Sequence, residues 1–193
     1  MKYKFSIVIL LAALSLVSCG EKIVDYYDFG PETSAPYSIG DYYNENGNCG
    51  VVFTVTENGY SGKIVSLVEI NESWNSYFDT IRVNTTDEYN GMNNLLIIKK
   101  QGPQHKFEAF AWCTSFGRGW YLPAVRELRQ IEENLDVINR TLVNHGFQII
   151  SKDEYWSSNE YDQDESWAVY IGHNQSSTKK KGSLQLVRAV YAF

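Results

Sequence analysis

The sequence predicts one α+β domain in which two helices are combined with mostly antiparallel, twisted strands. Two β-branched runs open this domain, an amphipathic helical stretch occupies its middle, and further strand-like runs close it. Strands, then helices, then strands again is an order typical of α+β domains. Of the 193 residues, 44% are hydrophobic and 21% are charged, which is the balance of a chain that buries a core.

Residues 1–18 have the pattern of a bacterial secretory signal. Lys2 and Lys4 form a positive start, and residues 7–17 form an apolar run that is too short to span a bilayer permanently. The run ends in LVSCG at 16–20, which is similar to the lipobox, where the thiol of an invariant cysteine is acylated before cleavage. We therefore expect a lipid anchor on Cys19. The alternative is an ordinary signal peptide with a free cysteine nearby.

Residues 19–38 are expected to be the lipid anchor and a flexible tether, and residues 39–193 the single folded domain. The tether contains Pro31 and Pro36 and shows neither a helical nor a strand period. Glu21, close behind the anchor, favours outer-membrane sorting or surface display. The expected location is the cell envelope of a Gram-negative bacterium, with the protein attached to the outer membrane through lipid.

The domain is expected to open with a β-hairpin. Residues 51–56 and 63–68 are rich in β-branched side chains, and the turn-forming pair Asn58-Gly59 lies between them. Residues 73–104 are expected to be irregular, since they combine aromatic side chains with a polar stretch that Gly91 interrupts.

Two helices are expected in the middle of the chain. The first covers residues 105–116, where apolar side chains recur at helical spacing before Gly117. The second follows Pro123, which suits a first helical position, and Asn134 is a point at which it could split in two. One apolar stripe runs along it, formed by Val125, Leu128, Ile131, Leu135, Ile138 and Leu142.

Strands are expected again after Gly146. Residues 155–158 and 167–171 have strand composition, and 179–182 form a basic turn. In the last segment, 184–193, alternate side chains are apolar, which predicts one strand inside a sheet with one buried face. We expect these late strands to be antiparallel.

Several motifs follow one another along the domain. They are GVVF at 50–53, IVSL at 64–67, GWYLPA at 119–124, EL at 127–128, YWSSNE at 155–160, SWA at 166–168 and VRAV at 187–190. In this order they resemble one bacterial family of domains of unknown function, related to the C-terminal domain of a collagen-like adhesin. The resemblance covers about residues 39–193 and implies the C-type lectin-like fold, which formylglycine-generating enzymes also elaborate.

Two cysteines remain once Cys19 carries lipid. In an oxidising envelope, Cys49 and Cys113 permit one disulfide, and the alternative is two buried thiols that act as small apolar groups. On its helix, Cys113 favours a core or disulfide position over a nucleophile. The formylglycine-generating reaction needs a reactive, copper-binding cysteine pair late in the chain, and no cysteine follows residue 113.

The sequence contains no recognisable catalytic constellation. The three histidines, His105, His145 and His173, form no H-E-x-x-H pair and have no second candidate ligand nearby, which argues against zinc. Residues 59–62 fall one residue short of a G-x-S-x-G elbow. We therefore expect no enzyme, no cofactor and no metal.

Sugar binding is the function that the resemblance suggests. Neither the Glu-Pro-Asn or Gln-Pro-Asp loop nor the Trp-Asn-Asp strand of calcium-dependent lectins occurs here. Oxygen-rich residues at 159–165 could coordinate a hard cation, tryptophans could stack on sugar rings, and lysines at 179–181 could meet an anionic polysaccharide. The alternatives are a solvated acidic loop, core tryptophans and lysines that keep a hairpin edge soluble. The candidate ligand-binding residues are Asn159, Glu160, Asp162, Asp164, Trp167 and Lys180.

The expected function is that of a membrane-anchored envelope lipoprotein whose non-catalytic domain binds a glycan or another surface protein in adhesion. One alternative is a structural or assembly subunit of an envelope complex, and a remote one is an enzyme of formylglycine-generating type. Nucleic acid is excluded as a partner because the chain is acidic, with a formal charge of −6. The membrane is contacted through the lipid on Cys19.

Overall fold

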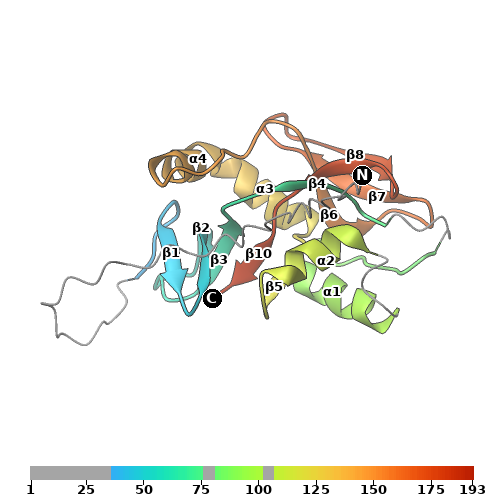
Figure 1. Cartoon of the computed structure of the whole chain (residues 1–193), viewed down its shortest axis with the longest axis horizontal. Coiled ribbons are helices and arrows are strands. Elements are labelled where there is room, and N and C mark those ends of the chain that lie inside the picture. The colour runs from blue at the N-terminus through green and yellow to red at the C-terminus, as the bar shows by residue number, and fades with distance from the viewer. Residues whose placement is uncertain (1–35, 76–80, 102–106) are drawn as a thin grey trace, which may run out of the picture. The chain divides into compact units, whose positions relative to one another are not determined.

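The computed structural model describes residues 36–75, 81–101 and 107–193, and the statements below concern these residues. The expected signal over 1–18, Cys19 and most of the tether over 19–38 lie outside them. The α+β class is confirmed: the described residues form two five-stranded sheets and four helices (Figure 1). The expected number of two helices is too low, for reasons given below.

The first sheet has the strand order β1-β2-β3-β10-β5, and every neighbouring pair is antiparallel. The expected hairpin is confirmed as β2 and β3, and Gly59 in its turn has a φ of 70°, a left-handed conformation that favours glycine. The strands of this sheet are β1 (Tyr42–Glu45), β2 (Asn48–Val55), β3 (Gly62–Ser66), β5 (Trp120–Tyr121) and β10 (Val190–Ala192).

The second sheet has the order β4-β9-β6-β7-β8. Its late strands are mostly antiparallel, as expected, although β6 and β9 run parallel. Lys179 and Lys180 belong to the edge strand β8, so the basic turn expected over 179–182 begins only at Lys181. The strands are β4 (Ile70–Ser73), β6 (Glu154–Glu160), β7 (Glu165–Tyr170), β8 (Gln175–Lys180) and β9 (Leu184–Val187).

The C-terminal segment contributes to both sheets. The chain crosses from β9 in the second sheet to β10 in the first at Arg188 and Ala189. The expectation that 184–193 forms one strand with one buried face is therefore wrong. Arg188 is itself buried: its Nε lies 2.8 Å from Oε2 of Glu69, and its Nη1 donates to the backbone oxygen of Ser66. The nearby carboxylate and carbonyl groups compensate the guanidinium charge.

Three helices occupy the middle of the chain: α2 (Glu108–Ser115), α3 (Val125–Glu133) and α4 (Leu135–Asn144). The split of the second expected helix falls at Asn134, where the sequence allows it. The Nδ2 of Asn134 donates to the backbone oxygen of Phe53 at 3.2 Å, and this bond holds the junction against β2. Within the described ranges, no helix is long and apolar enough to cross a membrane.

One further helix, α1 (Gly91–Lys100), lies in the segment 73–104 that the sequence predicts to be irregular, so that prediction is wrong there. Asn90 caps the helix, because its Oδ1 accepts a backbone N–H of the first turn at 3.0 Å. Gly91 begins the helix instead of breaking it. A Cβ at this position would clash with the backbone oxygen of Leu122, so glycine is needed for the close packing of α1.

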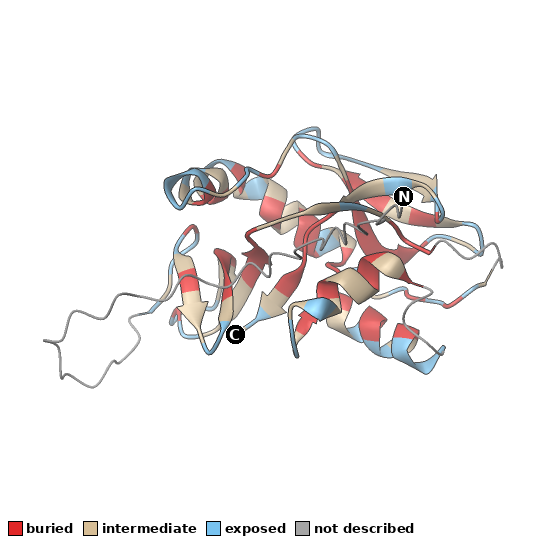
Figure 2. Ribbon diagram, viewed as in Figure 1, coloured by how far each residue is buried: buried red, intermediate tan, exposed pale blue. Residues whose placement is uncertain are grey.

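Most of the tryptophans belong to the core. Trp74, Trp120 and Trp156 are at most 2% exposed, and each indole N–H donates to a protein oxygen. Figure 2 shows buried positions along the strands of both sheets and on one side of each helix. Trp167 differs because it is only half-buried. The aromatic excess of the sequence therefore serves mainly the core.

Cys113 is a free thiol that is fully buried in α2. The Cys49–Cys113 disulfide that the sequence permits does not form in this structure, and Cys113 acts as a small apolar group in the core. Burial raises the pKa of its thiol. A raised pKa disfavours the reactive thiolate, so Cys113 has the environment of a structural cysteine.

Candidate functional site

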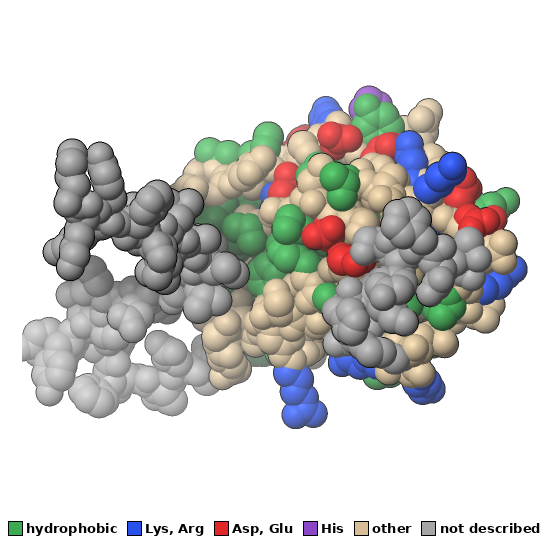
Figure 3. All heavy atoms as spheres, turned by 45° about the vertical axis from the view of Figure 1, so that its right-hand side comes forward, with side chains coloured by type: hydrophobic (Ala, Val, Ile, Leu, Met, Phe, Trp, Pro, Cys, Tyr) green, Lys and Arg blue, Asp and Glu red, His purple; other side chains and the backbone are tan. Residues whose placement is uncertain are grey.

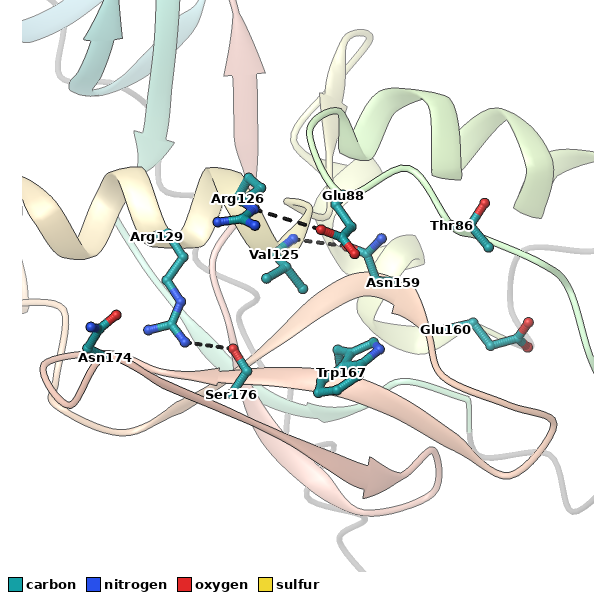
Figure 4. Close-up of a pocket in the computed structure, with 10 residues that line it drawn as sticks. All are labelled: Thr86, Glu88, Val125, Arg126, Arg129, Asn159, Glu160, Trp167, Asn174 and Ser176. Atoms are coloured by element: carbon teal, nitrogen blue, oxygen red, sulfur yellow. Dashed lines mark hydrogen bonds and ion pairs between the residues drawn. The ribbon is translucent and has the colours of Figure 1, made fainter.

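A pocket of about 430 Å³ lies between α3 and the β7–β8 face of the second sheet. Figure 4 shows the side chains that line it, which come from α3, from the loop before α1, from the end of β6, and from β7, β8 and the turn between them. Three of the six candidate residues are brought together here, namely Asn159, Glu160 and Trp167. Asp162, Asp164 and Lys180 do not line the pocket.

Strand register places Trp167 on the pocket floor. Trp167 is paired with Thr178 and Val169 with Ser176, so these side chains share one face of the sheet. Helix α3 covers the Val169–Ser176 level, where Arg129 donates from Nη2 to Ser176 Oγ at 2.7 Å and Val169 is fully buried. The next residue pair on the same face of the sheet is Trp167–Thr178, two residues along the strands. Trp167 lies beyond the part of the sheet that α3 covers, and its side chain is half-buried.

Asn159 is a structural residue of the pocket wall. Its Oδ1 accepts the backbone N–H of Val125 at 2.9 Å, and its Nδ2 donates to the backbone oxygen of Asp87 at 2.9 Å. These bonds cap the start of α3 and tie it to the loop before α1. Asn159 therefore shapes the pocket, and both ends of its amide already have partners.

Glu160 forms a buried ion pair with Lys181, at 2.6 Å between Oε1 and Nζ. The Glu160 carboxylate also accepts the backbone N–H groups of Val83 and Asn84, at 2.9 and 2.6 Å, and Lys181 donates to backbone oxygens as well. Lys181 is only 6% exposed, so it does not keep a hairpin edge soluble, which is one of the two roles that the sequence analysis gives to the lysines at 179–181. Glu160 is fully engaged by these partners.

The acidic cluster at 159–165 covers the end of β6, the turn at 161–164 and the first residue of β7. The Oδ1 of Asp162 accepts the backbone N–H groups of Asp164 and Glu165, each at 2.8 Å. These hydrogen bonds, that of Asp164 first, lower the pKa of Asp162. Across the described ranges, no three His, Cys, Asp or Glu side chains gather in a way that could hold a metal ion.

The wall opposite Trp167 contains an exposed charged pair that the sequence analysis missed. Arg126, on α3, and Glu88, in the loop before α1, lie 3.8 Å apart between Nε and Oε2, with side chains 56% and 57% exposed. Figure 4 places both side chains across the pocket from Trp167. A pair of this length and exposure contributes only about 0–1 kcal/mol, so a ligand can displace it.

A second group of bonds fixes the β7–β8 turn against α3. The Oε1 of Glu132 accepts the backbone N–H groups of Gly172 and Asn174, at 2.7 and 2.8 Å, and its Oε2 accepts from Arg129 at 2.6 Å. Partial burial favours the neutral carboxyl, but the hydrogen bonds from Asn174, Arg129 and Gly172 outweigh it and lower the pKa of Glu132. We call this group the Glu132 clasp.

Several polar groups at the pocket make no hydrogen bond within the described part of the chain. They are the indole N–H of Trp167, the hydroxyl of Thr86 and the side-chain amide of Asn174. Together with Arg126 and Glu88 they surround an aromatic side chain with donors and acceptors, as in pockets that orient a small polar ligand. The residues that line the pocket include no His, Cys or Lys that could serve as a catalytic base or nucleophile.

The fold is shared with a fimbrial protein. A crystal structure of a fimbrial protein from Bacteroides ovatus ATCC 8483 matches with a TM-score of 0.64 and 18% sequence identity, over 81% of this chain and 49% of that chain. The chain thus spans about half the length of the fimbrial protein. No family model and no curated protein matches the chain.

Sequence reasoning found Asn159, Glu160 and Trp167 and missed the pocket residues on α3, on β8 and in the adjoining loops. Arg126 and Arg129 are three residues apart and so share one face of a helix, which is the signal that could have linked them. No sequence spacing links Glu88 and Asn174 to the pocket. Each lies in a loop whose position depends on hydrogen bonds to residues far away in the sequence.

Proposed function

We propose that this protein is a lipid-anchored lipoprotein of a Gram-negative cell envelope and that it acts in adhesion: its non-catalytic domain binds a glycan or another surface protein. The pocket around Trp167 carries this proposal. We further propose that the domain is C-type lectin-like and belongs with the collagen-like adhesin domains whose motifs it resembles.

The chemistry of the pocket supports ligand binding. A half-buried indole provides apolar contact area, and polar groups beside it, which have no hydrogen-bond partner among the described residues, provide directional hydrogen bonds. The Asn159 bonds and the Glu132 clasp hold the walls in place before any ligand arrives. Such preorganisation lowers the entropic cost of binding.

The lipobox-like residues 16–20 support the anchor, and the fold shared with a fimbrial protein is consistent with a role at the cell surface. A lipidated cysteine carries several acyl chains, and each buried methylene contributes about 0.8 kcal/mol to membrane attachment.

Binding is tested by applying the mature protein to arrays of glycans and host-matrix proteins, with and without calcium. We expect a ligand whose binding is lost in Trp167→Ala and kept in Tyr60→Ala, an exposed aromatic residue in the β2–β3 turn outside the pocket. Absence of any ligand on both arrays would overturn the proposal.

The anchor is tested by cell fractionation. Replacement Cys19→Ala should move the protein from the membrane fraction to the soluble fraction, whereas Cys113→Ala should leave it in the membrane fraction. Membrane retention of the Cys19→Ala protein would contradict lipid anchoring.

The second candidate function is that of a structural or assembly subunit, and the shared fold with a fimbrial protein about twice as long favours it. Purification of the native lipoprotein from envelopes distinguishes the two. Stoichiometric partner proteins would support the assembly role, and a monomer without partners would oppose it.

A further inference from the structure

We infer that the pocket takes one unit of a neutral, hydroxyl-rich glycan chain, and that the following units lie in a groove along α3. This inference rests on the proposed function and specifies its ligand. It depends on the charge balance of the pocket, on the aromatic side chain of Trp167 at its floor, and on two hollows that adjoin the pocket.

Each charged group at the pocket already faces an opposite charge. Arg126 faces Glu88, Arg129 is bonded to Glu132, and Glu160 is paired with Lys181, at 3.8, 2.6 and 2.6 Å. No surplus positive charge remains to attract a uronic or sialic acid. Acidic and basic side chains are also intermixed over the face of the molecule in Figure 3.

The start of α3 provides no anion site either. The backbone N–H of Ala124 donates to Glu127, that of Val125 to Asn159, and that of Arg126 to the backbone oxygen of Glu88. Amide groups at a helix start bind anions only when they are unpaired. The pocket is therefore matched to hydroxyl groups and not to a carboxylate or phosphate.

The floor of the pocket is matched to the apolar face of a sugar ring. The Trp167 indole is half-buried, and the ring of Tyr161 meets it edge-on, with 5.3 Å between centroids. Tyr161 is itself 51% exposed and supports the indole from outside the set of residues that line the pocket. The indole N–H, Thr86 and the Arg126–Glu88 pair can exchange hydrogen bonds with ring hydroxyls.

The pocket continues into two further hollows. A hollow of about 590 Å³ shares Arg129 and Asn174 with it, and one of about 380 Å³ shares Glu132 and Gly172 with the second. Together they form a groove that runs past α3, whose 9 residues extend roughly 13 Å, and then past the start of α4, which contributes Leu135, Asp136, Val137 and Arg140 to the third hollow. A groove of this form suits a linear chain better than a single sugar.

A second aromatic side chain lies in the middle of this groove, in the hollow that adjoins the pocket. His173 lines the second hollow and stacks on Tyr170, with 3.8 Å between ring centroids. The groove thus has aromatic contacts at Trp167 and at His173, with the Glu132 clasp between them. We therefore expect a single glycan chain to place one sugar ring at Trp167 and another at His173.

The test is calorimetric titration of the mature protein with neutral gluco-, manno- and galacto-oligosaccharides, from monosaccharide to hexasaccharide, and with oligogalacturonates of matched length. We expect affinity for a neutral series to rise with chain length and to stay within about twofold when the salt concentration is raised about tenfold. Tighter, salt-sensitive binding of the uronates would overturn the inference.

Variants locate the ligand. Trp167→Ala should weaken binding of every length at least about tenfold, His173→Ala should weaken only the longer chains, and Tyr60→Ala should change nothing. Thermal unfolding of each variant verifies folding. Should Trp167→Ala not fold, Arg126→Gln is the replacement, since its side chain is exposed and its loss should weaken the neutral series.

The outcomes separate this inference from the proposed function. If a protein ligand on the array requires Trp167 and no glycan binds, the proposed function stands and the inference is wrong. Equal affinity for monosaccharide and hexasaccharide would disprove the groove. If neither array yields a ligand, both proposals fail.

Discussion

Lys181 and Glu160 form an ion pair inside the domain, with 2.6 Å between Nζ and Oε1 and side chains 7% and 2% exposed. The Lys181 ammonium also lies over the ring of Trp74, 5.1 Å from its centroid. The pair connects the turn after β8 to the end of β6, and Glu160 in turn holds the backbone of the loop before α1.

Replacement Lys181→Met should destabilise the domain by about 3–5 kcal/mol, because it leaves the Glu160 carboxylate buried without its partner. Urea unfolding followed by tryptophan fluorescence measures the loss. The matched control is Lys179→Met: Lys179 lies 2.7 Å from Glu154, but the side chains are 32% and 23% exposed. This variant should lose no more than about 1 kcal/mol, and equal losses would contradict the prediction.

The Glu132 clasp should open in acid. The folded pKa of Glu132 lies below its ordinary value of 4.5, so the clasp stabilises the fold above about pH 4.5 and is lost as the pH falls through the folded pKa. We expect the amide resonances of Gly172 and Asn174 to shift together in an NMR titration over this acidic range.

The matching variant is Glu132→Ala, which should shift the same two amides at neutral pH. Replacement of the neighbouring, exposed Glu133 by Ala should leave them in place. If neither the acid titration nor the Glu132→Ala substitution shifts the amide resonances of Gly172 and Asn174, the β7–β8 turn is held by other contacts.

Gly91→Ala should destabilise the domain by about 1–3 kcal/mol, because the added Cβ would clash with the backbone oxygen of Leu122 and force α1 away from it. Gly182→Ala serves as the control, since its nearest neighbour would lie 3.9 Å from the new Cβ. Chemical denaturation compares the two. If Gly91→Ala leaves the free energy of unfolding unchanged, the prediction is wrong and α1 can move away from Leu122 without loss of stability.

Cys113 should resist alkylation in the native protein, because its thiol is fully buried and burial raises its pKa. Iodoacetamide followed by peptide mass spectrometry should detect modification of Cys113 only after guanidinium is added. Rapid modification of the native protein would disagree with the core position described above.

The sequence predicted the elements that depend on near neighbours. The β2–β3 hairpin follows from two β-branched runs around Asn58-Gly59, and α3 and α4 follow from one apolar stripe with a weak point at Asn134. Helix α1 was missed because most of its apolar residues form the consecutive run Leu95 to Ile98, which has no helical spacing, and its start is marked only by the Asn90 cap. A consecutive apolar run in a short segment gives no clear hydrophobic period.

By itself, the sequence determined the α+β class, the hairpin, the helical stripe and three pocket residues, because periodicity and turn residues act within a few positions of the chain. Only the tertiary structure decided that Lys181 is buried, that 184–193 serves two sheets, and that Arg126 and Glu88 face Trp167. These features depend on bonds between distant residues, such as the bond from the Val83 amide to Glu160, which spans 77 positions. No local pattern encodes such a bond, since it forms only when sheets, helices and loops pack together.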